Sequence, residues 1–369
     1  MSLLAFREYD WVLLLVSIIL SAVGLAAIYS VDLSRDATLT FFPTQVAAFC
    51  LGLVVMCVLS SLHMTVYQST ARIFFLVSLI TLVLVLFFGT TIRGTTGWFR
   101  IGGFSFQPAE LAKAALILFL GWWVHLHGRR FDRWQFVFTS GFLSLLPAFL
   151  VLLQPDAGSA FIIGSLWFGI LLFTGTKKRY IALLLGSALV FLVIAWVFIF
   201  QSYQKERLHT FLDPERDPLG SGYNVVQSII AVGSGQFLGR GLGFGSQSQL
   251  HFLPEAQTDF IFSVIAEELG FVGVCVVMIL YAILLLRLIH VARRAPNDFA
   301  SYTTVGIALL LFIHILINIG GATGLLPVTG VPLPFLSYGG SSLLINFGLI
   351  GVAVSMARSG RSIYTQDED

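Results

Sequence analysis

Long apolar runs separated by short polar connections are the feature that most constrains the fold of this chain. A transmembrane helix needs about 20 mostly apolar residues to cross about 30 Å of hydrocarbon. By that measure the candidate spans are 11–30, 43–62, 73–89, 108–127, 139–153, 159–175, 181–200, 259–288, 302–320 and 339–357. The sequence therefore predicts an all-α integral membrane protein of about ten transmembrane helices. The fifth and sixth candidates are short, so they are either two spans or one bent hairpin.

The balance of apolar and charged residues excludes the soluble classes of protein. Hydrophobic residues make up 57% of the chain and charged residues 11%. A soluble domain carries about 25% charged residues, because water must solvate its surface. The surface of this chain is therefore expected to face hydrocarbon. The net charge of +2 is too small to indicate binding of nucleic acid.

The distribution of Lys and Arg predicts the orientation of the spans, because cytoplasmic loops carry an excess of these residues. With the N-terminus inside, alternate loops and the tail hold Arg72, Arg129, Arg130, Arg133, Lys177, Lys178, Arg179, Arg293, Arg294, Arg358 and Arg361. The short loops on the other side hold Arg35, Arg93 and Arg100. Both termini are therefore predicted to be cytoplasmic, which requires an even number of spans.

One connection is much longer than the others. Residues 201–258 are polar and rich in glycine and proline, and on this topology they form a large extracytoplasmic loop between the seventh and eighth spans. A segment of this length is usually functional or disordered. The apolar stretch 225–232 and the recurring Phe237, Phe244 and Phe252 favour a function. Residues 1–369 are predicted to form a single polytopic membrane domain that contains this loop.

Ionisable residues inside membrane spans are costly and are candidates for function. Glu110 and Lys113 lie at the start of the fourth span on the same helical face, so they can pair. The pair is either a structural ion pair or part of a binding site. Asp156 lies in the turn between the fifth and sixth spans. Glu267 and Glu268, inside the eighth span, are expected to be structural, because polar groups also hold membrane helices together.

Thr258 and Asp259 directly precede the eighth span, at its predicted outer end. Both are ordinary N-cap residues, so helix capping alone explains them. The functional interpretation is that Asp259 is a base at the membrane surface, which the positive end of the helix dipole keeps ionised. Residues 252–254 (FLP) would hold the approach to it rigid.

Two irregular segments flank this position. The glycine-rich run 233–245 lacks the context of a dinucleotide fingerprint. It is either a flexible loop or a segment whose N–H groups, with Arg240, approach a phosphate. Residues 326–341 contain three prolines and cannot form a regular helix. Apolar backbone of this kind is stable at membrane depth only when it packs in protein or lines a cavity, so a re-entrant cover is predicted.

Cations are predicted on the same outer side. Arg93, Arg100 and Lys113 are suited to an anionic head group, although solvated loop charges are the more ordinary explanation of the two arginines. The residues alone thus indicate an outer pocket with a base and several cations around it. A lipid-linked phosphate substrate fits this pocket, but the residues do not specify the reaction.

Several segments resemble, in order, the SEDS family of cell-shape, division and sporulation proteins, which includes RodA, FtsW and SpoVE. They are 107–113 (QPAELAK), 154–158 (QPDAG), 212–220 (LDPERDPLG), 227–235 (QSIIAVGSG), 247–262 (QSQLHFLPEAQTDFIF) and 327–342. The resemblance covers essentially the whole chain. The segment 247–250 (QSQL) favours the RodA branch, which serves cell elongation, over the FtsW branch.

The chain departs from the family pattern at two places that concern chemistry. The family usually has an arginine before the tryptophan that corresponds to Trp98, and this chain has Gly97 there. Arg93 or Arg100 is therefore the expected substitute as a phosphate-binding cation. Gln257 stands where the family usually has a histidine, which disfavours a mechanism that needs that histidine as a proton partner.

The resemblance implies a peptidoglycan glycosyltransferase that polymerises lipid II at the outer face of the bacterial cytoplasmic membrane during cell elongation. In that scheme Asp259 is the general base. The residues implied for substrate binding are Arg93, Trp98, Arg100, Glu110, Lys113, Asp156, Arg240 and Ser337. A divalent cation, Mg²⁺ or Mn²⁺, is a candidate cofactor with unknown ligands, and no organic cofactor is expected. The implied partners are a class B penicillin-binding protein and other membrane proteins of the elongation complex.

Two other classes of function remain open at this point. The spans with Glu110, Lys113 and Glu267 would also suit a lipid II flippase. The third interpretation is a non-catalytic scaffold that only positions the transpeptidase.

Overall fold

The computed structural model describes residues 9–34, 39–92, 94–101, 104–128, 131–198, 202–213 and 221–366. Within these residues nine helices are long and apolar enough to cross a membrane, and a tenth apolar helix has 17 residues. They are α2 (Trp11–Leu33), α3 (Phe41–Ser61), α4 (Met64–Phe88), α5 (Pro108–His127), α6 (Trp134–Leu152), α7 (Ala157–Phe173), α8 (Lys178–Phe198), α12 (Ile261–Arg293), α13 (Asp298–Ala322) and α14 (Gly340–Gln366). The predicted all-α membrane protein with about ten spans is confirmed.

The predicted and observed spans differ most at α4 and at the α6–α7 pair. α4 begins at Met64 rather than at 73. Its polar first turns are accommodated, because the Arg72 guanidinium lies 4.9 Å from the centre of the Trp122 ring. The fifth and sixth predicted spans are two separate helices, α6 with 19 residues and α7 with 17, joined by a short turn. They pack together, and the Trp167 indole N–H donates to the Ser140 hydroxyl across the contact at 3.2 Å.

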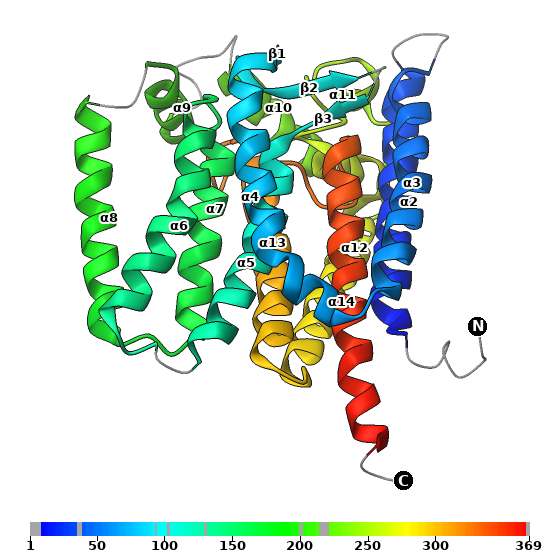
Figure 1. Ribbon diagram of the computed structural model, residues 1–369. Helices are drawn as coiled ribbons and strands as arrows, with labels where there is room; N and C mark the ends of the chain where they lie inside the picture. The colour runs from blue at the N-terminus through cyan, green and yellow to red at the C-terminus, as the bar shows by residue number, and fades with distance from the viewer. Residues whose placement is uncertain are drawn as a thin grey trace.

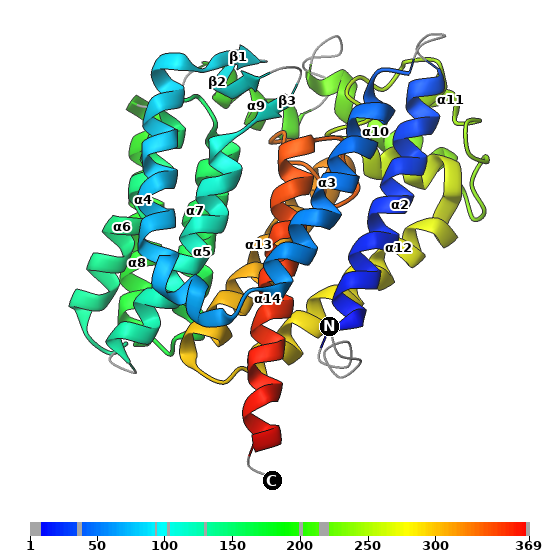
Figure 2. The same cartoon turned by 45° about the vertical axis from the view of Figure 1, so that its right-hand side comes forward.

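The chain begins and ends at the same end of the bundle, as Figure 1 and Figure 2 show for the start of α2 and the end of α14. Near the end of α14, the Arg358 guanidinium donates to the Tyr9 hydroxyl at 3.4 Å and lies 4.9 Å from the centre of its ring. We call this the terminal end. The opposite end carries a small antiparallel sheet and is called the sheet end.

The sheet has three strands, β1 (Thr90–Ile92), β2 (Thr95–Ile101) and β3 (Phe104–Phe106), in the order β1-β2-β3. Thr90 pairs with Trp98, and Ile92 pairs with Thr95 across a turn where Gly94 has a φ of +79°. The fold prediction contained no strand, because strands this short leave little periodicity in a sequence. β2, which carries Arg100, lies against α4 and α5 at this end of the bundle.

The long segment between α8 and α12 is folded against the sheet end. It contains α9 (Ser202–Leu212), α10 (Ser221–Ser234) and α11 (Ser246–Gln249). In α10 the Ser228 hydroxyl donates to the Ala322 carbonyl of α13 at 2.6 Å and lies 2.7 Å from the Ser263 hydroxyl of α12. The apolar stretch 225–232 is thus part of a helix that packs on the bundle.

The segment between α13 and α14 has the non-helical, buried backbone expected of a re-entrant cover. Residues 323–339 form no regular helix or strand, yet Leu336 is fully buried. The Tyr281 hydroxyl of α12 donates to the Pro334 carbonyl at 2.6 Å. Gly24 of α2 permits the close approach of this segment, since a Cβ there would lie 2.6 Å from the Leu336 carbonyl oxygen. The segment is held by protein groups, as such backbone must be in a membrane.

α12 is broken at Gly270, which has a φ of +67° and a ψ of −168°. The glycine-rich run packs against this break. The N–H groups of Arg240 and Gly241 donate to the carbonyls of Glu267 at 3.0 Å and Glu268 at 2.9 Å. The run therefore satisfies carbonyls that the break leaves without helical partners. These two N–H groups are consequently not available to a phosphate.

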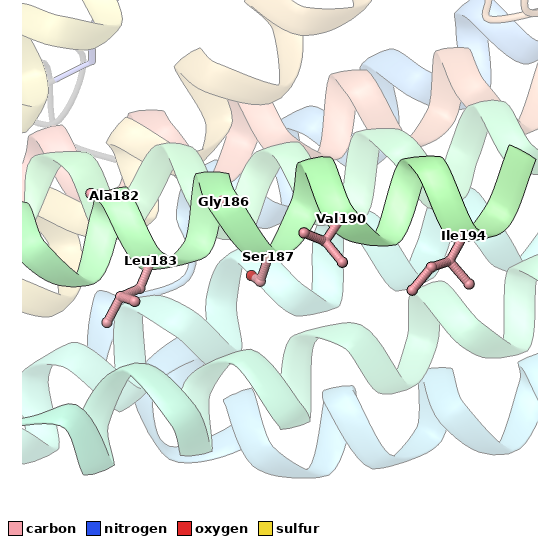
Figure 3. A pocket seen from close by; sticks show the side chains of 6 residues that line it. All are labelled: Ala182, Leu183, Gly186, Ser187, Val190 and Ile194. Atoms are coloured by element: carbon pink, nitrogen blue, oxygen red, sulfur yellow. The ribbon is translucent and has the colours of Figure 1, made fainter.

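α8 stands apart from the other spans in Figure 1. Only 6% of its most apolar stretch is buried. A face with Gly186, Ser187 and Val190 lines an open, apolar surface pocket of about 530 Å³, as the close view in Figure 3 shows. The packed core is formed mainly by α5, α13 and α14, whose apolar stretches are mostly buried.

Candidate functional site

Asp259 lies in a turn immediately before α12 at the sheet end. The backbone N–H groups of Thr258 and Asp259 donate to the Glu255 carbonyl at 3.0 and 3.2 Å. The N-cap of α12 is Phe260, whose side chain makes no capping bond. Asp259 therefore precedes the cap, so the interpretation of this residue as a simple helix cap is not supported. Its side chain is half-buried.

Asp259 lines a small cavity between the start of α12, the end of α13 and the re-entrant segment. A Cβ built on Gly330 of the re-entrant segment would lie 3.9 Å from Asp259 Oδ2. Asn318 of α13 joins the walls of the cavity. Its Nδ2 group donates to the Asp259 carbonyl at 3.0 Å and to the Val331 carbonyl at 2.9 Å.

Ser337 fastens the re-entrant segment to the turn that carries Asp259. Its hydroxyl donates to the Thr258 carbonyl at 2.6 Å and accepts from the Leu333 N–H at 2.8 Å. The next residue, Tyr338, donates its N–H to the Gln257 carbonyl at 2.8 Å. Both of these hydrogen bonds of the Ser337 hydroxyl are thus made with backbone groups. Its geometry is that of a residue that positions the site, and its predicted contact with substrate stays a prediction.

Asp156 lies at the start of α7 and approaches the same region. Its carboxylate caps α7 by accepting from the Ser159 N–H at 2.9 Å, and it accepts from the Gln107 side chain at 3.3 Å. Gly158, in the first turn of α7, is packed on the re-entrant segment, since a Cβ there would lie 3.0 Å from the Thr329 carbonyl oxygen. The two turns with the sequences QPAE and QPDA therefore meet beside the cavity.

Glu110 and Lys113 form a buried ion pair in the first turns of α5. The distance from Lys113 Nζ to Glu110 Oε1 is 2.7 Å, and the side chains are 1% and 3% exposed. Lys113 Nζ also lies 3.2 Å from Nε2 of His314, which is fully buried in α13. The ammonium group is enclosed by protein partners, which favours the structural interpretation of the pair over direct binding of a phosphate.

Trp98 and Arg100 lie on the sheet, and Arg240 lies on the glycine-rich run. Trp98 is half-buried in β2, and Arg100, on the same strand, is exposed. Gly97 is buried against the α6–α7 turn, since a Cβ there would lie 3.1 Å from Gln154 Oε1. The Arg240 side chain is exposed. Arg93, the other predicted substitute for the missing arginine, lies outside the described residues.

Glu267 and Glu268 hold the loop to α12. Glu267 accepts from the backbone N–H groups of Gln247 at 2.8 Å and Ser248 at 3.2 Å. Glu268 accepts from the Ser30 hydroxyl of α2 at 2.5 Å. These contacts favour the structural role expected for both residues.

Comparison with known proteins assigns the family. Residues 10–362 match the family of FtsW, RodA and SpoVE, described as "Cell cycle protein". The chain belongs to the SEDS family. The peptidoglycan glycosyltransferase MrdB of Escherichia coli K12 is 38% identical over 315 residues, which cover 85% of this chain and 84% of MrdB. The probable peptidoglycan glycosyltransferase FtsW of Trichlorobacter lovleyi is 37% identical over 363 residues, which cover 95% and 93% of the two chains.

A solved SEDS relative supports the same fold. The chain superimposes on a protein from "Structural coordination of polymerization and crosslinking by a peptidoglycan synthase complex" with a TM-score of 0.81. The two are 34% identical, and the match covers 95% of this chain and 98% of the other. As a SEDS protein, this chain is a multi-pass protein of the bacterial cytoplasmic membrane. MrdB and FtsW are similarly close to it, so identity alone does not separate an elongation role from a division role.

Three residues of this SEDS site were not selected from the sequence. Asn318 and His314 lie inside the apolar run of α13, and Thr329 lies in the re-entrant segment. The available signal was polarity within a span, since buried amide and imidazole groups are costly in hydrocarbon. The spacing of Asn318 and His314 places them on one face of α13, which faces α5 and the turn before α12.

A resident metal is not supported by the side chains of this SEDS chain. Within the part of the chain that the structure describes, no group of three or more His, Cys, Asp and Glu side chains could hold a metal ion. Mg²⁺ is usually bound by one or two carboxylates together with substrate phosphates and waters. The protein donors therefore do not fit a metal site of their own, and no step below is derived through a metal.

Proposed function

We propose that this SEDS protein polymerises lipid II into glycan strands at the outer face of the cytoplasmic membrane during cell elongation, with Asp259 as the general base. The chain is a SEDS peptidoglycan glycosyltransferase, the activity that its curated relatives carry in their names. The proposal adds the substrate, the face of the membrane, the cellular role and the residue that removes the proton.

The observation that carries the assignment is the position of the Asp259 carboxylate. It is half-buried at the sheet end, in a turn whose backbone Asn318 and Ser337 hold in place. In the proposed reaction a hydroxyl of the acceptor GlcNAc attacks the anomeric carbon of the donor MurNAc. The bond from that carbon to the pyrophosphate oxygen breaks, and undecaprenyl pyrophosphate leaves. Asp259 takes the hydroxyl proton as the new glycosidic bond forms.

The leaving pyrophosphate needs cations, and two exposed arginines are accessible among the described residues. Arg100 on β2 and Arg240 in the glycine-rich run project at the sheet end, whereas Lys113 is enclosed. We assign pyrophosphate contacts first to these two arginines, because a charge acts on a developing anion only where it reaches it. A divalent cation would arrive with the pyrophosphate. Loss of polymerase activity on chelation by EDTA, and its restoration by Mn²⁺ or Mg²⁺, test the role of the divalent cation.

The outer face is assigned to the sheet end from the distribution of basic residues. Arg72, Lys177, Arg293 and Arg358 are all at the terminal end, which is therefore proposed to be cytoplasmic. Single cysteines at Phe244 and Arg294, in a background that lacks Cys50, Cys57 and Cys275, separate the two faces. An impermeant thiol reagent added to intact cells is expected to label Phe244→Cys and not Arg294→Cys. The reverse pattern would overturn the orientation.

A class B penicillin-binding protein is the proposed partner. The support is the solved relative at a TM-score of 0.81, which comes from a peptidoglycan synthase complex that coordinates polymerization and crosslinking. A transpeptidase beside the polymerase would cross-link each strand as it is made. Co-purification of the full chain with such a partner from a co-expressing strain tests the association.

The function is tested with purified full-length chain, with and without the partner, and labelled lipid II in detergent. A polymerase gives a ladder of glycan chains that a muramidase digests. A flippase or a scaffold gives no ladder under these conditions, because detergent removes the bilayer and neither forms a glycosidic bond. Absence of a ladder from a folded complex would contradict the proposal.

The elongation role rests on the segment 247–250, which forms α11 and its cap. Complementation tests this finer assignment. Expression in a rod-shaped bacterium depleted of its own elongation polymerase is expected to restore rods, and expression in one depleted of its division polymerase is expected to leave filaments. Rescue of division alone would assign the chain to the division branch.

A further inference from the structure

Two residues that line the cavity beside Asp259 each carry a buried oxygen atom for which the reaction above has no use. Asn318 is 5% exposed, and its Oδ1 atom has no hydrogen-bond partner among the described residues. The buried hydroxyl oxygen of Thr329 has none within the same residues. Asn318, Thr329 and Asp259 all line this cavity. Buried polar atoms normally have a hydrogen-bond partner, so two such atoms at one cavity indicate a bound group.

The size of the cavity limits what that group can be. Its volume is about 10 Å³, and roughly 10–15 Å³ on this measure holds a single water molecule. The remaining side chains of the lining are apolar and include Ile317, Val328 and Val331. A hard cation such as Mg²⁺ requires near-octahedral oxygen ligands. The waters that usually complete the Mg²⁺ shell would not fit in this cavity, whereas one carboxylate, one amide oxygen and one hydroxyl suit the two donors and the acceptors of a single water.

We propose that one water molecule occupies this cavity and is bound by Asn318, Thr329 and Asp259. The Thr329 hydroxyl donates to the water, and the water donates to Asn318 Oδ1 and to one carboxylate oxygen of Asp259. Both orphaned atoms are then satisfied, and the water makes the three hydrogen bonds that are usual for buried water. The inference rests on the proposed role of Asp259 as the base. The water orients one carboxylate oxygen and leaves the other for the acceptor hydroxyl.

The water makes Asn318 and Thr329 positioning residues with a measurable electrostatic effect. A donor to an ionised carboxylate stabilises the charged form and lowers the pKa of the acid. Loss of the water would therefore raise the pKa of Asp259. Because the base acts in its ionised form, the acidic limb of the profile of kcat/KM against pH would move to higher pH.

Other titratable groups lie on the elements around the cavity. They are Glu255 on the same turn, Asp156 at the start of α7, Tyr338 in the re-entrant segment and His314 on α13. None of them is changed by a substitution of Thr329. A shift of the acidic limb that appears on loss of the Thr329 hydroxyl, and that disappears when the hydroxyl is restored, therefore reports on the proposed water.

The experiment measures the pH profile of lipid II polymerisation by the full-length chain with its partner. Thr329→Val is expected to move the acidic limb up by roughly one pH unit. Thr329→Ser, which keeps the hydroxyl, is expected to keep the wild-type limb. The matched control is Thr323→Val, since the Thr323 hydroxyl bonds to the Ile319 carbonyl at 2.8 Å and lies outside the cavity lining. It is expected to leave the limb in place.

The proposed water would be overturned if the acidic limb of the Thr329→Val profile coincides with that of the wild type. It would also be overturned if the limb of Thr329→Ser shifts as far as that of Thr329→Val. If Thr329→Val does not fold, a density map of the wild-type protein at better than about 2 Å decides. A water peak within hydrogen-bond reach of the three side chains supports the inference, and an empty cavity overturns it. Failure of the proposed base is distinguishable, because Asp259→Asn would then keep its activity whatever the Thr329 variants do.

Discussion

Asp259 and Glu267 are carboxylates on one stretch of chain at the sheet end, and their surroundings differ. Glu267 is fully buried and accepts two backbone N–H groups, from Gln247 and Ser248, with the Ser246 hydroxyl nearby at 3.3 Å. Asp259 is half-buried, and its carboxylate lies near Gly330. The protein thus surrounds the Glu267 carboxylate with backbone donors, whereas Asp259 lines a small cavity.

The difference shows how structural and catalytic acids can be separated in a membrane protein. A buried carboxylate that is saturated by fixed donors is stable as an acceptor, and loss of its acceptor oxygens would disrupt the loop that it holds. A general base must gain a proton during turnover, so it needs space and a surrounding backbone that other residues fix. Asn318 and Ser337 fix that backbone, which leaves the carboxylate of Asp259 to the chemistry. The predictions below test this division of roles.

The largest loss of stability is expected at the Glu110–Lys113 pair. Lys113→Met leaves the buried Glu110 carboxylate without its partner, which should lower the free energy of unfolding by about 3–5 kcal/mol. The double variant Glu110→Gln with Lys113→Met should recover part of the loss, because no unpaired charge remains. Thermal unfolding in detergent measures both. If Lys113→Met keeps its stability and loses only activity, the pair binds substrate after all.

A somewhat smaller loss is expected for Glu267→Ala. The substitution leaves the buried N–H groups of Gln247 and Ser248 without their acceptor, at a cost of about 2–4 kcal/mol in the free energy of unfolding. The loop around α11 should also become sensitive to added protease. Glu267→Gln, which keeps an acceptor oxygen, should lose less and keep most polymerase activity. A stable Glu267→Gln protein with no activity would place Glu267 in the chemistry and break the comparison with Asp259.

A modest effect is expected where α12 holds the re-entrant segment. Tyr281→Phe removes the hydroxyl that donates to the Pro334 carbonyl and leaves that carbonyl buried. The free energy of unfolding should fall by about 1–1.5 kcal/mol. Activity should fall by a similarly small factor, since the substitution lies away from Asp259. Chemical denaturation of the variant beside wild type checks the value, and a loss above about 4 kcal/mol would show a larger role for this contact than one hydrogen bond.

The smallest effect is expected at an ion pair on the surface of the terminal end. Asp132 and Lys177 lie 3.4 Å apart, and their side chains are 60% and 47% exposed. Exposed pairs contribute about 0–1 kcal/mol, so Asp132→Asn should change stability and activity within experimental error. It is the control for the buried substitutions. A clear loss in Asp132→Asn would mean that the assay responds to any change of charge.

The sequence predicted what depends on hydropathy and on backbone chemistry. The apolar runs predicted the spans, and the prolines of 327–334 predicted a non-helical segment that must be buried. The start of α4 was placed too late, because Arg72 interrupts the apolar run although Trp122 accommodates it. The two short candidates, now α6 and α7, were not separable by length alone.

The sequence did not predict the contacts that build the site. The three-stranded sheet was missed because its strands are short. Asn318 and His314 were missed because the sequence around a lone polar residue in a span does not show which distant residue it contacts. The glycine-rich run was predicted to be flexible or phosphate-binding, and it packs on the break at Gly270 because only glycines allow that approach. Each of these depends on pairs of residues far apart in the chain.

The rate of lipid II polymerisation by Asp259→Asn tests the central claim most directly. Asparagine keeps the size of the side chain and removes its basicity, so the fold and the association with the partner should persist. The account predicts a fall in rate of roughly 100-fold or more, in the range that loss of a general base produces. Glu267→Gln, measured beside it, should keep most of the rate. An Asp259→Asn protein that folds normally and polymerises lipid II at near the wild-type rate would contradict the assignment.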